Sequence, residues 1–315
     1  MAELLSICIP TYNRSEYLSE LLESIGREIE QEPELAHKIQ IYISDNASTD
    51  STCEVCQQFH RKHNILDYSR NERNIGGDRN IIKCCTLGSG KYRWVVGDDE
   101  LIAWGGLVHI IKTLESQKPG LFINNDGRYR AKLSLPGKYQ DFREFANAAI
   151  KAGNPHMLIA HTLITCNVFL STCFDRAIAE YMLPNTQYAH MYGLVAGLVK
   201  TGGSVYVTEY KTIHVREQRA GEYRVGDKEE SRLIINLEKY WAEYIEWIRD
   251  FVNVPKLEVD KALRYPFDSK TKCARFILYF EMRLARFVPS KVKAFMKSVY
   301  PFRVIIQFID RRASA

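Results

Sequence analysis

Short apolar runs alternate with amphipathic stretches along the first hundred residues of the chain. Four runs have the length and apolar character of buried strands, and they lie at residues 4–9, 39–43, 65–68 and 92–96. Between them, apolar positions recur at helical spacing in three stretches, which begin near Ser15, after Asp50 and after Gly77. This alternation predicts a parallel sheet with right-handed crossovers, and Ser15 is the predicted cap of the first helix.

The pattern is less regular after residue 100. We expect helices at 105–114, 142–150 and 188–199, strands at 121–123, 163–170, 204–210 and 212–216, and a loop at 126–140. Residues 228–252 have the spacing of a long amphipathic helix, and the helical segments after it are interrupted by prolines. Gly221 and Gly226 mark a boundary, so we predict a first domain at residues 1–225 and a helical region at residues 226–315.

Polar residues follow three of the predicted strands, at residues 10–14, 44–50 and 97–100. The carboxyl ends of parallel strands lie at one edge of a sheet, where ligands bind, so we expect these residues to converge on one crevice. Asp98 and Asp99 would be costly there without a cation, and their hard oxygen atoms suit Mg²⁺ or Mn²⁺, which also bind substrate phosphates. The alternative for this pair is a helix N-terminus with an acidic first turn.

A glycine-containing loop, residues 74–80, precedes the third predicted helix. Glycines let a ligand approach the backbone closely, and the N-terminus of a helix favours phosphate. The loop matches neither the dinucleotide-binding fingerprint nor the P-loop motif. We expect Asp78 or Arg79 to contact a sugar or a diphosphate, with an ordinary solvated helix start as the alternative.

The ordered set of motifs resembles the family 2 glycosyltransferases with the GT-A fold, and within them the branch around the abequosyltransferases of O-antigen assembly. The matching residues are Pro10 to Arg14, Ser44 to Asp50, Asn74 to Gly77, and Gly90 to Tyr92 leading to Gly97-Asp98-Asp99. The resemblance covers roughly residues 3 to 216. It implies an α/β protein with the Rossmann-like GT-A fold, a mostly parallel sheet flanked by helices, here with a C-terminal helical extension.

The resemblance also implies roles for single residues. In the family a D-x-D site holds a metal and the donor diphosphate; here Gly97 takes the first acidic position, which leaves Asp99 as the direct ligand and Asp98 as a ribose or water-mediated contact. Asp45 corresponds to the residue that accepts a hydrogen bond from the nucleoside base, and Tyr12 is placed to stack on that base; a local turn and plain packing are the alternatives for these two. The predicted nucleotide-sugar contacts are Pro10, Thr11, Tyr12, Asn13, Arg14, Asp45, Asn74, Gly76, Gly77, Asp78 and Asp98.

An inverting sugar transfer needs a general base near the acceptor hydroxyl. In the family this is usually an Asp in an E-D pair, but residues 186–192 of this chain contain no carboxylate. We predict His190 as the base, because imidazole titrates near neutral pH, and a structural histidine is the alternative. His214 is predicted as a third metal or diphosphate contact, again with a structural role as the alternative. Weaker candidates on the acceptor side are Asp126, His156 and His161.

Cysteine usage and the absence of a leader indicate the compartment. Most of the eight cysteines lie in apolar patterns, which suits free thiols in a reducing environment. Cys53 and Cys56 have C-x-x-C spacing, but no second pair completes a zinc site, so we do not expect metal or redox chemistry there. No apolar run is long enough for a transmembrane helix and the start of the chain lacks a secretory signal, so we expect a cytoplasmic protein.

Charge is concentrated at the C-terminal end. Residues 270–315 contain eleven Lys and Arg against two acidic residues, a net charge of +9, while the whole chain carries +5. Aromatic and aliphatic residues are interleaved with these charges, which is typical of helices on an anionic membrane surface. We expect the chain to bind the cytoplasmic face of the inner membrane, with packing against the catalytic domain as the alternative. A nucleic-acid partner is not expected, because no binding motif is present.

These observations predict a metal-dependent, inverting glycosyltransferase that uses Mn²⁺ or Mg²⁺ and a nucleotide-sugar donor. The expected acceptor is a glycan, such as a lipid-linked oligosaccharide of O-antigen or another surface polysaccharide. A sugar nucleotidyltransferase is a weaker alternative, because it would need a glycine-rich basic loop after the first strand. A non-catalytic GT-A-like protein that binds nucleotide sugars is the other alternative, because Gly97 and the missing E-D pair depart from the family pattern.

Overall fold

A computed structural model describes residues 3–125, 135–151, 164–184 and 188–215 of the chain, without the side chains of residues 150, 151 and 215. Contacts divide the chain into two compact units, Met1–Ala148 with Met157–Glu217, and Ala149–His156 with Gln218–Ala315. Nearly all described residues belong to the first unit, which the following paragraphs concern. The predicted domain boundary at residue 225 and the basic C-terminal region lie outside the described residues.

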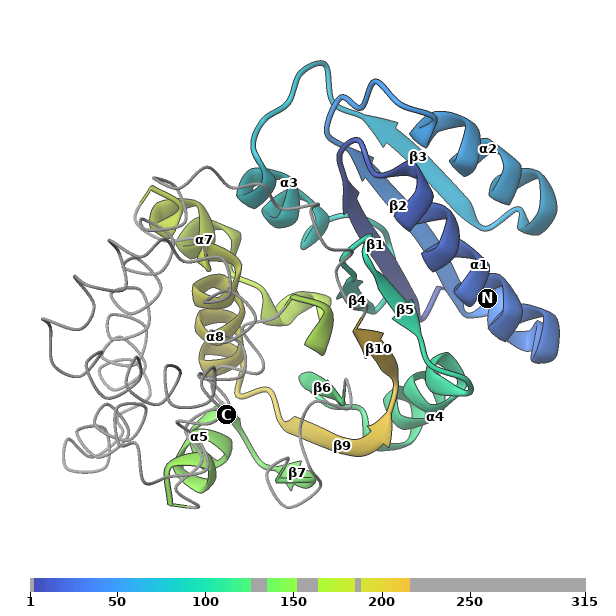
Figure 1. Cartoon of the computed structure of the whole chain (residues 1–315). Coiled ribbons are helices and arrows are strands. Elements are labelled where there is room, and N and C mark those ends of the chain that lie inside the picture. The colour runs from blue at the N-terminus through green and yellow to red at the C-terminus, as the bar shows by residue number, and fades with distance from the viewer. Residues whose placement is uncertain (1–2, 126–134, 152–163, 185–187, 216–315) are drawn as a thin grey trace, which may run out of the picture. The chain divides into compact units, whose positions relative to one another are not determined.

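Eight of the described strands form one mixed sheet in the order β3-β2-β1-β4-β8-β6-β9-β7 (Figure 1). The first four strands in this order run parallel; β8 is antiparallel to β4 and β6, β9 is parallel to β6, and β7 is antiparallel to β9. Their bounds are β1 Leu5–Thr11, β2 Ile39–Asp45, β3 Leu66–Arg70, β4 Tyr92–Val95, β6 Leu121–Asn125, β7 Gly137–Tyr139, β8 Asn167–Leu170 and β9 Val205–Lys211. A separate antiparallel pair joins β5 (Glu100–Ile102) to β10 (Ile213–Val215).

Helices cover both faces of the parallel half of the sheet. Alternating residues of β1 divide between them: Leu5, Ile7 and Ile9 belong to the main core with α1 (Ser15–Gln31), α2 (Thr52–His63) and α4 (Gly106–Gln117). On the other face, the Cys8 thiol donates to the carbonyl of Leu87, just after α3 (Gly77–Cys84). The remaining helices are α5 (Phe142–Lys151), α7 (Arg176–Met182) and α8 (Ala189–Thr201), with short 3₁₀ turns at Pro33–His37, Ile164–Cys166 and Ser171–Cys173.

A buried carboxylate fixes α4 to α1. Glu28 in α1 is 3% exposed, and its two oxygen atoms accept the backbone N–H groups of Gly105 and Leu107 at 2.7 and 3.1 Å. These N–H groups belong to the first turn of α4, which has no intrahelical acceptors for them. Glu28 therefore caps a helix from outside it, and this contact holds the segment after β5 against the core.

The structure confirms the parallel βαβ order and differs from the sequence predictions at several elements. Ser15 does not cap α1: Arg14 is the N-cap residue and makes no side-chain capping bond. The strand expected at 163–170 begins with a 3₁₀ turn, and part of the expected loop at 126–140 is the short strand β7. Two elements, β5 and α7, were not predicted, because three-residue strands and seven-residue helices are too short to produce a clear period.

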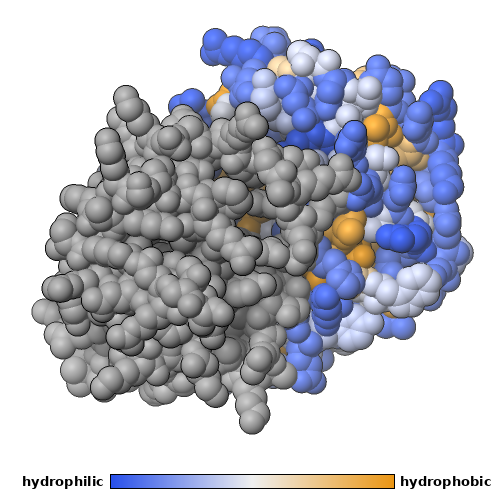
Figure 2. Space-filling view, in the orientation of Figure 1, coloured by the Kyte–Doolittle hydropathy of each residue, from blue (hydrophilic) through white to orange (hydrophobic). Residues whose placement is uncertain are grey.

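The face drawn in Figure 2 is mainly hydrophilic over the described residues, with apolar residues scattered among polar ones. None of the helices in the described ranges has the length and apolarity needed to cross a membrane. The cysteines at described positions are all free thiols.

Candidate functional site

Three neighbouring strands end at one edge of the sheet, and the predicted site residues extend from them. β1 lies between β2 and β4, and Thr11 at its end is in register with Asp45 at the end of β2. The loops beyond are joined by backbone bonds: the Asn46 N–H donates to the Thr11 carbonyl at 2.9 Å, and the Asn71 N–H donates to the Asp45 carbonyl at 2.8 Å. The structure therefore brings the segments that follow β1 and β2 together, next to the end of β4.

The end of β4 carries two carboxylates that face the β1 segment. Asp98 is 5% exposed; its Oδ2 accepts the Thr11 hydroxyl at 2.8 Å, and its Oδ1 lies 3.0 Å from Nη1 of Arg14. The same Arg14 nitrogen lies 3.3 Å from Oδ2 of Asp99. Burial raises the pKa of Asp98 to about 6, although the Arg14 guanidinium beside it acts in the opposite direction. One positively charged nitrogen thus lies between the two carboxylates.

The two aspartates do not begin a helix. They form a turn after β4, and the next residue, Glu100, starts strand β5. The interpretation of this pair as a helix N-terminus with an acidic first turn is therefore wrong. The partners of the two carboxylates include the Thr11 hydroxyl, which bonds to Asp98, and Arg14, which lies beside both.

The absence of a side chain at Gly97 leaves room for the Asp99 carboxylate. A Cβ atom at residue 97 would lie 2.9 Å from Oδ1 of Asp99 and 3.5 Å from the Thr165 hydroxyl. The Gly97 N–H donates to that hydroxyl at 2.9 Å, and the Thr165 carbonyl accepts the Trp94 ring N–H at 2.8 Å. The departure from a D-x-D pattern at this position thus coincides with close packing of Asp99 over the backbone.

The two carboxylates fit a divalent cation whose coordination is completed by a ligand. They supply hard oxygen donors around a point that Arg14 Nη1, a positive charge, already occupies. In the described ranges, no group of three or more His, Cys, Asp or Glu side chains is assembled for a metal, so His214 does not complete a set with Asp98 and Asp99. Mg²⁺ is often held in this way, by one or two carboxylates with substrate phosphates and water.

Asp45 is held by its own loop. It is 1% exposed; Oδ1 accepts the Ser48 N–H at 2.8 Å, and Oδ2 accepts the Tyr68 hydroxyl at 2.5 Å, with Arg70 Nε at 3.6 Å. The bond from Ser48 is the local turn that was the alternative for Asp45. Burial, and then the hydrogen bond to Asp45, raise the pKa of Tyr68 well above its usual range. Tyr12, in contrast, is 44% exposed, so its ring is accessible for stacking.

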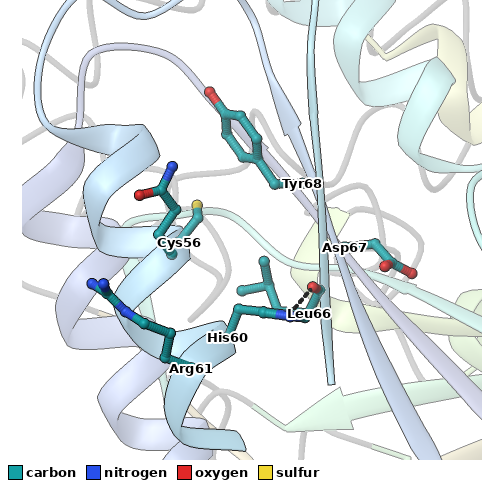
Figure 3. A pocket seen from close by; sticks show the side chains of 7 residues that line it. Cys56, His60, Arg61, Leu66, Asp67 and Tyr68 are labelled. Carbon is teal, nitrogen blue, oxygen red and sulfur yellow. Dashed lines mark hydrogen bonds between the residues drawn. The ribbon is translucent and has the colours of Figure 1, made fainter. Parts of the chain in front are cut away.

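A pocket lies beside this cluster, between α2 and β3 (Figure 3). Its volume is about 400 Å³. Its lining includes Tyr68, Cys56 and His60, and the His60 ring nitrogen Nδ1 lies 2.8 Å from the Leu66 carbonyl. Burial raises the pKa of Cys56 to about 12, which keeps it a neutral thiol. The pocket contains neither Asp98 nor Asp99, and we assign it no role.

The loop between β1 and α1 is fastened to the loop before α2. Oδ1 of Asn13 accepts the Thr49 N–H at 2.7 Å, and the Asn13 N–H donates to the Ser48 hydroxyl at 2.9 Å. Asp50 joins two helix starts: Oδ2 accepts the Ser15 N–H at 2.8 Å, and Oδ1 accepts the Thr52 N–H at 3.2 Å and the Thr52 hydroxyl at 2.6 Å. The polar residues of both motifs therefore shape the crevice as well as facing it.

The glycine loop is tied to the end of β2. Oδ1 of Asn74 accepts the Asn46 side-chain amide and the Gly76 N–H, both at 2.8 Å. Gly76 has a φ of 90°, a conformation that favours glycine, and a Cβ at Gly76 or Gly77 would meet no atom of the described residues within 4 Å. Among the residues that the structure describes, there is therefore open space in front of the N-terminus of α3.

Asp78 lies near the start of α3, and Tyr188 and His190 lie at the start of α8, a helix that contacts α3. Asp78 is half-buried and burial raises its pKa; burial, and then the Asp78 charge, raise the pKa of Tyr188. His190 is 8% exposed in the first turn of α8, with its ring centroid 6.4 Å from that of Tyr188. This burial is compatible with the structural alternative for His190.

His214 and the acceptor-side candidates are placed differently. His214 is exposed on β10, opposite Leu101 of β5, and burial followed by the Lys211 charge lowers its pKa. Asp126, His156 and His161 lie outside the described residues.

Several contributors were missed at the level of sequence. Arg14 pairs with Asp98 and Asp99, which are 84 and 85 positions further along the chain. No local sequence pattern predicts this pairing. Tyr68, Arg70 and Thr165 were also not singled out. Tyr68 and Arg70 end a strand beside β2, so the rule that placed Asp45 in the crevice would have found them.

The chain is similar to known glycosyltransferases in sequence. The "Glycosyl transferase family 2" model matches residues 6–166. The abequosyltransferase RfbV of Salmonella typhimurium is 43% identical over 115 residues, which are 36% of this chain and 33% of that protein. The glycosyltransferase GlyG of Streptococcus pneumoniae is 25% identical over 129 residues, 41% of each chain. The chain thus matches between a third and two fifths of the length of these curated relatives.

Solved structures of other proteins are similar to this chain in fold. Residues 1–349 of S. aureus TarS, in complex with UDP, superpose with a TM-score of 0.55 at 16% identity, covering 98% of this chain and 88% of that one. The mannosyltransferase PcManGT of Pyrobaculum calidifontis, in complex with GDP-Man and Mn²⁺, gives a TM-score of 0.51 at 14% identity, covering 100% and 87%. The predicted GT-A fold is confirmed, and this chain belongs to family 2 of the glycosyltransferases.

Proposed function

We propose that this chain is an inverting, metal-dependent glycosyltransferase that moves a sugar from a nucleotide-sugar donor to a glycan. The observation that carries the proposal is the convergence of Asp98 and Asp99 on one cationic atom at the ligand-binding edge of a GT-A sheet. Two neighbours in fold support a nucleotide-sugar donor, since TarS is solved with UDP-GlcNAc and PcManGT with GDP-Man and Mn²⁺.

In this proposal the donor lies across the ends of β1, β2 and β4. The exposed ring of Tyr12 stacks on the base, and Asp45 accepts a base N–H after the half-exposed Arg70 turns away. The diphosphate faces the open space at Gly76 and Gly77. Asp98 and Asp99 hold a divalent metal, which when bound neutralises the charge that develops on the leaving diphosphate.

The transfer is a single displacement at the anomeric carbon. An acceptor oxygen forms the new C–O bond while the bond to the diphosphate breaks, and the electron pair of that bond leaves with the diphosphate. The proton of the acceptor hydroxyl passes to a general base, for which we propose His190. Configuration at the anomeric carbon is inverted, because the acceptor attacks from the face opposite to the leaving group.

We propose a lipid-linked oligosaccharide of O-antigen, or another surface polysaccharide, as the acceptor. The similarity to an abequosyltransferase supports this acceptor class. The net charge of +9 over residues 270–315 supports a position at the anionic cytoplasmic face of the inner membrane.

The test is turnover of a panel of nucleotide sugars by the full chain, with Mn²⁺, Mg²⁺ or EDTA. We expect one donor to release nucleoside diphosphate only with metal, and proton NMR of the product to show the opposite anomeric configuration. Retained configuration would contradict the inverting mechanism, and full activity in EDTA would contradict the metal. Binding of a nucleotide sugar without any turnover would instead favour the non-catalytic alternative.

A further inference from the structure

One nitrogen atom of Arg14 takes the place of a cation between two aspartates. Nη1 lies 3.0 Å from Oδ1 of Asp98 and 3.3 Å from Oδ2 of Asp99. Guanidinium does not lose its proton in proteins, so this atom carries positive charge at every working pH. Asp98 is buried, and two adjacent carboxylates repel each other, so a positive charge between them offsets part of that repulsion.

The Arg14 side chain is free enough of the core to move away from this position. It is the residue just before α1, and its side chain is 30% exposed, whereas that of Asp98 is 6% exposed. Its guanidinium carbon lies 5.9 Å from the centre of the Tyr17 ring, a contact at the outer limit for a cation–π interaction. The Arg14 side chain is therefore long and partly solvated, while the Asp98 carboxylate is buried and held by the Thr11 hydroxyl.

A divalent cation and a guanidinium cannot share one point. A metal held by both aspartates must displace Nη1, because like charges a few ångströms apart repel strongly in a partly buried site. A diphosphate offers the displaced guanidinium a new partner, since guanidinium binds phosphate oxygens with two parallel hydrogen bonds. Arg14 lies at the same strand end as Thr11, so the diphosphate of the proposed donor would be within its reach.

We infer that Arg14 is an internal counter-cation that fills the position between Asp98 and Asp99 until a nucleoside diphosphate draws it away. This inference rests on the proposed function, because the proposed donor supplies the diphosphate. Metal binding and nucleotide binding are then coupled through one side chain, and the coupling is reciprocal. The wild-type protein binds metal weakly alone and more tightly with the nucleotide.

The test is Mn²⁺ binding, measured from the electron paramagnetic resonance signal of free Mn²⁺, with and without UDP, GDP, CDP or dTDP. Arg14→Met should bind Mn²⁺ alone at least about fivefold more tightly than wild type, and nucleotide should increase its Mn²⁺ affinity less. Arg27→Met is the matched control, because Arg27 is exposed on α1, the helix that Arg14 precedes, and its loss removes the same charge. The control should bind Mn²⁺ as wild type does.

Arg14→Lys should return the weak binding of Mn²⁺ alone, which separates the effect of charge from that of side-chain size. Circular dichroism checks that Arg14→Met is folded, and Arg14→Gln, with the same expected result, replaces it if it is not. Unchanged or weaker Mn²⁺ binding by the neutral variants would overturn the inference.

The two proposals fail in different ways. If wild type binds a nucleoside diphosphate but the neutral variants do not gain Mn²⁺ affinity, the Arg14 inference is wrong and the proposed function stands. If the neutral variants gain Mn²⁺ affinity but wild type binds none of the four nucleotides, Arg14 is a counter-cation and the proposed donor site is wrong. Mn²⁺ binding by no variant under any condition overturns the inference together with the metal site.

Discussion

The hydroxyl of Thr11 donates a 2.8 Å hydrogen bond to Oδ2 of Asp98, 87 residues further along the chain. Thr11 is the last residue of β1, and Asp98 follows the neighbouring parallel strand β4. The bond therefore fixes a carboxylate at the ligand-binding edge of the sheet by a partner from the adjacent strand. Both groups are buried, so the contact contributes to stability as well as to the shape of the site.

Replacing Thr11 with Val should destabilise the protein. Valine has nearly the same shape as threonine but no hydroxyl, so the buried Asp98 carboxylate loses a hydrogen-bond donor. We expect the free energy of unfolding in urea to fall by about 1.5–3 kcal/mol, the usual range for hydrogen bonds to charged groups. Thr113→Val is the control: Thr113 is also buried, but its hydroxyl bonds to the His109 carbonyl within its own helix, and its loss should cost less. Equal losses in the two variants would contradict a special role for the Thr11 bond.

Asp50→Asn should lower stability in a pH-dependent way. Burial raises the pKa of Asp50, but its hydrogen bonds from Thr52 and Ser15 outweigh burial, so the pKa lies below the ordinary 3.8. A depressed carboxyl pKa adds stability above the unfolded value that is lost as the pH falls through the folded value. The difference in melting temperature between wild type and Asp50→Asn should therefore be constant near neutral pH and shrink below pH 3.8. A difference that does not change with pH would contradict the ionic role of this cap.

Gly97→Ala should impair metal-dependent binding more than folding. The new Cβ would lie 2.9 Å from Oδ1 of Asp99, which is the end of a flexible side chain and can move. We expect a change of less than about 1 kcal/mol in the free energy of unfolding, as for many tolerated substitutions. Calorimetry should show weaker binding of a nucleoside diphosphate with Mn²⁺ and unchanged binding in EDTA. An equal loss of nucleotide binding with Mn²⁺ and in EDTA would show that the substitution does not act through the Asp99 carboxylate.

His190→Gln tests the proposed base. If His190 takes the acceptor proton, the rate of sugar transfer should fall by about 10²- to 10⁴-fold, with little change in donor affinity. His60→Gln is the control, because His60 is an exposed residue beside β3 whose ring nitrogen bonds to the Leu66 carbonyl, away from Asp98 and Asp99. A transfer rate within a few-fold of wild type would leave His190 with a structural role.

The parallel half of the sheet and the meeting of its strand ends were predictable, because β1, β2 and β4 are short, mostly apolar segments followed by polar residues. Their chain order and parallel direction then leave little freedom in where Thr11, Asp45 and Asp98 lie. The alternative for Asp98 and Asp99, a helix start, is wrong because the chain continues into β5, which has only three residues, too few to show a strand period.

The pairing within the site was not predictable from the sequence. Arg14 was expected among the nucleotide-sugar contacts, but the two aspartates that it pairs with are far away in the chain. Such pairs depend on the packing of whole elements, and the types of the residues allow many other combinations. The same reason explains why Ser15 was wrongly expected to cap α1. The Ser15 N–H donates instead to Asp50, which lies in the loop before α2.

The most direct test of the account is calorimetric titration of UDP, GDP, CDP and dTDP into the wild-type protein and Asp99→Asn, with Mn²⁺ and with EDTA. The account predicts that one nucleotide binds wild type with Mn²⁺, and that EDTA or Asp99→Asn each weakens this binding at least about tenfold, or 1.4 kcal/mol. Binding of no nucleotide to the folded protein, or equal binding in Mn²⁺ and EDTA, would contradict a metal-dependent donor site at Asp98 and Asp99.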